Sequence, residues 1–186
     1  MRSRAGRYDA PARPRLPCRL QTAQLGNSMS LILNARPLDA AALAPYASVL
    51  GSIDSKARMV PDVMEKGDVP GAHAFTILCP QPVSGPVRIP ALERHPHSTQ
   101  SFLPIVAGRW LVLVAPTAAG GEPDLNGAMA FVAGPEDAIC IGRNVWHAGL
   151  TVLDRPAQFG MIMWKAESAE DGVLHELVEP VTVTMP

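Results

Sequence analysis

The chain has 186 residues, of which 47% are hydrophobic and 18% are charged. This length fits one globular domain, and the 19 prolines and 15 glycines favour short strands joined by turns over a helical bundle. The formal net charge is −1, and the arginines gather near the N-terminus. The remaining body has no basic excess of the kind that nucleic-acid binding requires. We therefore expect a small-molecule substrate and no nucleic-acid partner.

The segment 1–28 is rich in arginine and proline and has no periodic apolar face, which predicts a disordered extension upstream of a start at Met29. A mitochondrial-type targeting peptide is the alternative, although its prolines oppose an amphipathic helix. Cys18, Cys79 and Cys140 lack the CxxC spacing of a thiolate zinc site, and they indicate reduced cysteines of a cytoplasmic protein. No apolar run reaches the roughly 20 residues needed to span a bilayer, so no membrane partner is expected.

Strand patterns dominate the rest of the chain, residues 29–186. Residues 30–34 predict a first strand, and Asp39 predicts the N-cap of a short helix at Ala40–Val49. Residues 56–71 combine prolines, glycines and mixed charge, which indicates an exposed loop or a weak edge strand. The strands that follow recur at short intervals, and this spacing is typical of an all-β sandwich or small closed barrel. They are predicted at Ala74–Cys79, Val87–Leu92, Thr99–Ile105, Arg109–Ala115, Ala128–Val132, Ala138–Ile141, Gly149–Leu153, Gln158–Lys165 and Leu174–Val183.

Three of the five histidines fall in two separate segments, LERHPHSTQSF and IGRNVWHAG. His95 and His97 alternate with a proline, so in an extended segment their side chains point to the same side. Together with the amide of Gln100 and with His147 from a distant strand, they could hold a divalent ion, since imidazole suits zinc, nickel, manganese or iron. The alternative is that these histidines are surface residues or hydrogen-bonded core residues, because an HxH pair alone is a weak signal.

The stretch LERHPHSTQSFLPIVAG, followed later by GRNVWHAGL, resembles the signature of the ureidoglycolate lyase family of the cupin superfamily. The family has an E-R-H-P segment before a T-Q-x-F-[IL]-P strand and a late R-N-V-W-H, and the resemblance covers residues 29–165. It implies a cupin-type double-stranded β-helix (jelly-roll) barrel with one short N-terminal helix. It also implies a cytoplasmic homodimer and a carbon–nitrogen lyase that splits ureidoglycolate into glyoxylate and urea during purine nitrogen catabolism.

The resemblance also implies a metal-binding set. In cupins, an HxH pair, a following Glu or Gln and a later His form this set, and by position these are His95, His97, Gln100 and His147. A divalent ion is therefore the expected cofactor, and no organic cofactor is expected.

Cleavage of ureidoglycolate requires a base for the hydroxyl proton and an acid for the departing urea nitrogen. His95, His147 and Glu93 are the candidates for these catalytic roles. The substrate carboxylate requires a cation, and Arg143 or Arg94 stands next to each motif. Arg143 is favoured because strand alternation turns Arg94 away from His95, and structural ion pairing is the alternative for both arginines.

Three other polar or aromatic side chains could contact the substrate, namely Gln100, Asn144 and Trp146. A left-handed turn residue is the alternative for Asn144, and a core aromatic is the alternative for Trp146. The chain also departs from the family, because MVPDVMEKGDVPGAHAF stands where members carry N-N-G, an Arg and a His-Asp pair. Two further hypotheses therefore stay open: a divergent metal-dependent cupin enzyme that acts on another small carboxylate, and a non-catalytic cupin that binds a small molecule.

Overall fold

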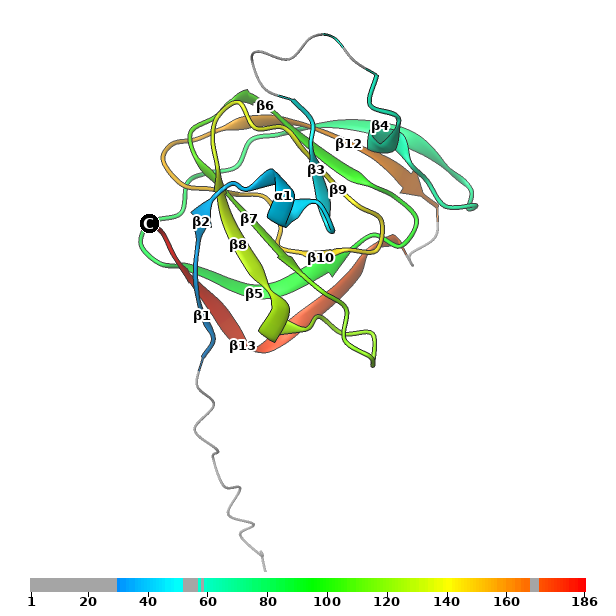
Figure 1. Ribbon diagram of the computed structural model, residues 1–186. Coiled ribbons are helices and arrows are strands. Elements are labelled where there is room, and N and C mark those ends of the chain that lie inside the picture. The colour runs from blue at the N-terminus through cyan, green and yellow to red at the C-terminus, as the bar shows by residue number, and fades with distance from the viewer. Residues whose placement is uncertain (1–29, 52–56, 58, 168–170) are drawn as a thin grey trace, which may run out of the picture.

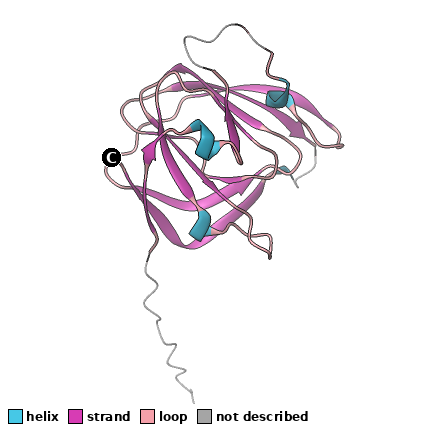
Figure 2. Ribbon diagram, in the orientation of Figure 1, coloured by secondary structure: helices cyan, strands magenta, loops and turns pink. Residues whose placement is uncertain are grey.

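The computed structural model describes residues 30–51, 57, 59–167 and 171–186, so the predicted N-terminal extension 1–28 lies outside the described residues. Strands make up nearly all of the regular structure, with three short helical segments (Figures 1 and 2). Among the described residues, no helix has the length and apolarity to cross a membrane. The elements are β1 Ile32–Asn34, β2 Arg36–Pro37, α1 Ala40–Leu43, β3 Ala47–Val49, η1 Pro61–Met64, β4 Gly71–Leu78, β5 Val87–Arg94, β6 Gln100–Val106, β7 Trp110–Ala115, η2 Leu125–Gly127, β8 Met129–Ala133, β9 Ile139–Ile141, β10 Trp146–His147, β11 Thr151–Val152, β12 Gln158–Ala166 and β13 Val173–Thr184.

The strands form two sheets. The eight-stranded sheet has the order β1-β13-β5-β10-β7-β8-β2, with β11 also paired to β7, and the five-stranded sheet has the order β3-β9-β6-β12-β4. The end strands β1 and β2 are consecutive in the chain and are separated only by Ala35, whose N–H donates to the Thr184 carbonyl. The eight-stranded sheet therefore curls until its two ends meet at Ala35 (Figure 1). Most pairings are antiparallel, and the near closure leaves few unpaired strand edges.

Strand alternation sorts the apolar side chains into two cores. On β7, Val112 and Val114 belong to one core with Phe159 of the five-stranded sheet, whereas Leu111 and Leu113 belong to a second core on the other face of the eight-stranded sheet. Both faces of β7 are therefore buried, which explains why its sequence is an unbroken apolar run. This all-β, nearly closed barrel with two packed sheets confirms the predicted cupin-type jelly roll.

The predicted helix is shorter than its pattern indicated. Asp39 caps α1 as predicted, because its Oδ1 accepts from the N–H groups of Ala41 and Ala42 at 3.0 and 3.1 Å. The helix nevertheless ends at Leu43, so the prediction of a helix through Val49 is wrong. Pro45 cannot donate a helical hydrogen bond, and the chain turns there into β3, which pairs with β9.

The nine strands predicted after residue 71 all exist, within a few residues of their predicted bounds. The sequence did not predict β2, β3 and β10, each of which has only two or three residues. Elements this short carry no periodicity, so the pairing partners alone define them as strands.

The burial of Ile139 between the sheets predicts that a substitution there lowers the stability more than the same substitution at an exposed isoleucine. Ile139 is fully buried in this core, whereas Ile105 is 52% exposed. Ile139→Val should lower the free energy of unfolding by about 0.5–1.5 kcal/mol, because it removes a packed methylene group. Urea denaturation of both variants tests this, with Ile105→Val as the chemically matched control. Equal losses in the two variants would contradict this assignment of the core.

Candidate functional site

The short strand β10 places the candidate site between the two sheets. β10 lies between β5 and β7, where His147 pairs with Glu93 on one side and with Val114 on the other. Residues paired in this way point to the same face, and Val114 belongs to the core between the sheets. Gln100 opens β6 of the facing sheet and lies opposite Met163. Side chains from both sheets therefore meet at this end of the barrel.

Four polar side chains converge there: Glu93, His95, Gln100 and His147. One ligand atom from each of Glu93, His95 and His147 can be chosen so that all three lie within 4.8 Å of one another. The Nε2 atom of His147 is 3.0 Å from Gln100 Oε1 and 3.6 Å from Glu93 Oε1. The ring centroids of His95 and His147 are 5.5 Å apart. Both histidines and Gln100 are buried, while the Glu93 side chain is about one-third exposed.

Backbone carbonyls determine which nitrogen of each imidazole carries the proton. His147 Nδ1 lies 2.9 Å from the Val145 carbonyl, and His95 Nδ1 lies 2.6 Å from the Asp171 carbonyl. A carbonyl oxygen only accepts, so in the neutral rings each Nδ1 carries the proton and each Nε2 presents a lone pair. The Nε2 atom of His95 is buried and has no hydrogen-bond partner among the described residues.

This arrangement brings acceptor atoms together with no proton between them. The lone pair of His147 Nε2 faces the carbonyl oxygen of Gln100, whose amide nitrogen donates to Met161 Sδ at 3.4 Å. Rotating the Gln100 amide would offer His147 a donor, but it would also turn the Gln100 carbonyl oxygen toward the Met161 sulfur. Buried acceptors that converge without donors are costly unless a cation or a proton joins them. Two imidazoles, a carboxylate and an amide oxygen therefore fit a divalent metal ion.

Burial also controls the charge of His147. The pKa of His147 is lowered from 6.5 to about 4, mainly by removal from water and also by the neighbouring His95, against the opposing effect of the Val145 carbonyl. At neutral pH the His147 ring is uncharged, so its contact with Glu93 is not an ion pair. A neutral imidazole is the form that binds a metal ion.

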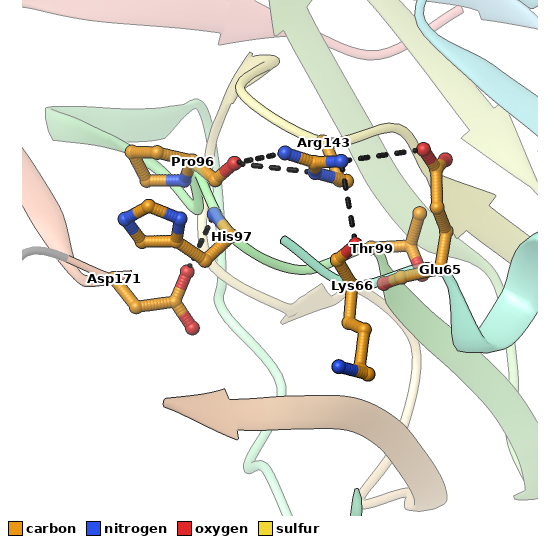
Figure 3. A network of polar contacts seen from close by, with 7 residues as sticks. All are labelled: Glu65, Lys66, Pro96, His97, Thr99, Arg143 and Asp171. Atoms are coloured by element: carbon orange, nitrogen blue, oxygen red, sulfur yellow. Dashed lines mark hydrogen bonds and ion pairs between the residues drawn. The ribbon is translucent and has the colours of Figure 1, made fainter. Parts of the chain in front are cut away.

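Arg143 and Asp171 contact the turn at Pro96 and His97, which directly follows His95 in the chain (Figure 3). The Arg143 guanidinium donates twice to the Pro96 carbonyl, at 3.2 and 3.1 Å, and also reaches the Glu65 carboxylate at 3.5 Å. On the opposite side, the Asp171 carboxylate accepts from the His97 N–H at 2.8 Å and from Ser98 Oγ at 3.1 Å. Asp171 therefore fixes the turn through its side chain and the His95 ring through its main-chain carbonyl.

The prediction that His95, Pro96 and His97 form an extended segment is wrong, because Pro96 and His97 lie in a turn after β5. The His97 ring packs against Gly67, where a Cβ atom would lie only 2.8 Å from His97 Nδ1. The structure does not bring His97 into the cluster of ligand atoms, and Glu93 stands there in its place. Glu93 lies in the cluster because it is two residues before His95, and residues two apart along an extended strand share a face.

The other predicted substrate residues lie away from the cluster. Arg94 lies over the Trp146 ring, 4.5 Å from its centroid, and Trp146 belongs to the core on the far face of the eight-stranded sheet. Asn144 is exposed and has a φ of 60°, which is the left-handed turn conformation. Arg143 contacts the Pro96 carbonyl and the Glu65 carboxylate, so it supports the turn after β5. Asp171 was missed in the sequence because a single aspartate after β12 carries no signal.

Two separate pockets are each lined by one residue of the cluster. A pocket of about 360 Å3 is lined by Glu93, together with Arg88 and Thr151. A pocket of about 440 Å3 is lined by His95, together with Met163 and Lys165. Each pocket can hold a small organic molecule next to one of the cluster side chains.

A comparison with protein-family models matches residues 30–184 to the family described as ureidoglycolate lyase. The chain belongs to the ureidoglycolate lyase family. This membership confirms the resemblance that the ERHP and RNVWH segments predicted.

Several relatives carry the family name. A protein of Agrobacterium fabrum, provisionally named as a ureidoglycolate lyase, is 32% identical over 153 residues, which are 81% of this chain and 94% of that protein. Ureidoglycolate lyase 2 of Rhizobium meliloti is 32% identical over 137 residues, which are 68% of this chain and 82% of that protein. Among solved structures, RmlC from Streptococcus suis in complex with dTDP-D-xylose has 11% identity and a TM-score of 0.39, over 53% of this chain and 47% of that chain.

The lowered pKa of His147 predicts a pH-dependent loss of stability in chelator-treated protein. Unfolded His147 binds a proton near pH 6.5 and the folded residue binds one only near pH 4, so the stability is lost as the pH falls through this window. The loss should be on the order of 3 kcal/mol, and His147→Gln should reduce it. Urea denaturation between pH 7 and pH 4 measures the effect, with the exposed His73→Gln as control. A His147→Gln profile parallel to that of the wild type would contradict the assignment.

Proposed function

We propose that this protein is a ureidoglycolate lyase that cleaves ureidoglycolate into glyoxylate and urea. The family match over residues 30–184 and the similarly named relatives support this function. The observation that carries it chemically is the buried Nε2 of His95, which has no hydrogen-bond partner among the described residues and belongs to the cluster with His147 and Glu93. His95 also lines a pocket, and an unpartnered imidazole lone pair beside a pocket is suited to accept a proton from a bound substrate.

Ureidoglycolate carries a hydroxyl group, a carboxylate and a ureido nitrogen on one carbon atom. Cleavage moves the hydroxyl proton to a base, converts the C–O bond to the aldehyde, and breaks the C–N bond with its electron pair going to the urea nitrogen. That nitrogen then takes up a proton, so no external reactant is consumed. One group that first accepts and then returns the proton is sufficient for this elimination.

His95 is the better base of the two histidines. The lowered pKa of His147 makes this ring a poor proton acceptor at neutral pH. His95 Nδ1–H donates to the Asp171 carbonyl, which stabilises the imidazolium that forms when Nε2 accepts the substrate proton. His147 and Gln100 then serve to position the substrate, and Glu93 is the next candidate for the proton transfer because its carboxylate reaches solvent.

Glu93, His95, Gln100 and His147 would also hold a divalent metal ion, because their free acceptor atoms converge. Such an ion would act as a Lewis acid toward the substrate hydroxyl and carboxylate. The Nε2 of His95 cannot hold an ion and accept a proton at the same time, so the two roles are experimentally distinguishable.

Four finer assignments follow from the family resemblance and belong to the same proposal. The reaction is a carbon–nitrogen elimination of the amidine-lyase type, and it serves the breakdown of purine nitrogen through allantoin. The active protein is a homodimer of the cytoplasm. Light scattering of the purified protein tests the dimer directly.

The decisive assay measures urea and glyoxylate released from racemic ureidoglycolate, corrected for spontaneous decay. Wild-type protein should release both products in equal amounts, and His95→Gln should lower kcat by a factor of about 100 or more, because it removes the acceptor nitrogen. His97→Gln is the matched control, since His97 lies two residues away but outside the cluster, and it should keep nearly full activity.

Chelator treatment of the same assay separates the two roles of His95. Loss of activity that is restored by one divalent ion would support the metal site, whereas unchanged activity would support His95 as the base. Equal activity of His95→Gln and His97→Gln would contradict both roles. Absence of product with wild-type protein would contradict the lyase function.

A further inference from the structure

The pocket beside His95 contains a cation that the mechanism above does not use. Lys165 lines this pocket of about 440 Å3 together with His95, whose Nε2 is unpartnered. We propose that Lys165 binds the carboxylate of the substrate and thereby selects for small carboxylic acids. This inference rests on the proposed lyase function, because it names the residue that recognises the acid group of that substrate.

Strand alternation on β12 directs Lys165 toward the site. Met161 Sδ accepts from the Gln100 amide, and Met163 pairs with Gln100 and is buried. Lys165 lies two residues further along β12, so its side chain emerges on the same face as these methionines. Lys165 itself is exposed, and it lines the same pocket as His95. A ligand bound in this pocket is therefore within reach of both side chains.

The other arginine and lysine side chains near the cluster contact other groups or line another pocket. Arg143 braces the Pro96 carbonyl, and Arg94 lies over Trp146 on the far face of the sheet. Lys66 lies over the Trp164 ring, with its Nζ 4.6 Å from the centroid. Arg88 lines the other pocket and stands five residues before Glu93 on β5, a separation of roughly 16 Å along an extended strand. Among the described lysines and arginines, Lys165 alone lines the same pocket as His95.

Two acidic residues also line the Lys165 pocket. The Asp171 carboxylate accepts hydrogen bonds from the His97 N–H and from Ser98 Oγ, so its charge is directed at the turn. Glu167 is exposed beyond the end of β12 and forms no ion pair with Lys165 among the described residues. The Lys165 ammonium is therefore available to an anionic ligand, and Glu167 opposes such a ligand by like-charge repulsion.

Steady-state kinetics of Lys165→Met tests the inference. Loss of a charged hydrogen bond should raise KM for ureidoglycolate by about 10- to 100-fold while kcat changes by less than about threefold, because the reacting groups stay in place. Lys165→Arg should recover most of the affinity, since it restores a cation at the same position. Arg88→Met removes a cation from the other pocket and should leave KM unchanged.

Binding of glyoxylate, measured by calorimetry on the full chain in the presence of chelator, gives a readout that needs no turnover. Lys165→Met should weaken this binding at least tenfold, whereas Glu167→Gln, which removes the opposing charge from the same pocket, should leave it equal or tighter. Unchanged KM and unchanged glyoxylate affinity in Lys165→Met would overturn the role of Lys165 while the lyase function stands. Lysine-dependent glyoxylate binding by a protein without lyase activity would retain the carboxylate site and overturn the proposed reaction.

Discussion

The site depends on two hydrogen bonds from buried imidazoles to backbone carbonyls. His95 donates Nδ1–H to Asp171 and His147 donates Nδ1–H to Val145, so both Nε2 lone pairs are left for the space between the sheets. The carbonyls belong to the main chain, and the fold itself therefore sets the tautomers. If either carbonyl moved, a ring could rotate and the convergence with Glu93 and Gln100 would be lost.

This convergence explains why the barrel includes so short a strand as β10. Two residues are enough to place His147 between Glu93 of β5 and Val114 of β7, and the left-handed conformation at Asn144 turns the chain into that position. Trp146 anchors the strand from the opposite face through its packing in the second core. A polar cluster inside an apolar barrel is costly, and the core on both faces of the eight-stranded sheet supplies the burial that offsets this cost.

The turn after β5 positions His95 relative to the strands of the barrel. Arg143 donates to the Pro96 carbonyl of this turn. Asp171, which precedes β13, accepts from the His97 N–H of the same turn. Arg143, which the sequence analysis favoured as a substrate-binding residue, thus supports the turn next to His95. The cation that lines the pocket beside His95 is Lys165, which comes from the opposite sheet and from outside both sequence motifs.

The sequence by itself determined the fold class, the family and the segments that carry the site. Alternating apolar strands and turn residues predicted the barrel, and the segments LERHPHSTQSF and RNVWH contained the four cluster residues Glu93, His95, Gln100 and His147. The tertiary structure decided which side chains share a face. Pro96 begins a turn that removes His97 from the cluster, and Pro45 ends the helix at Leu43. The short strands, the tautomer of His95 and the Asp171 contacts depend on partners that are distant in the sequence, and no local pattern encodes such long-range contacts.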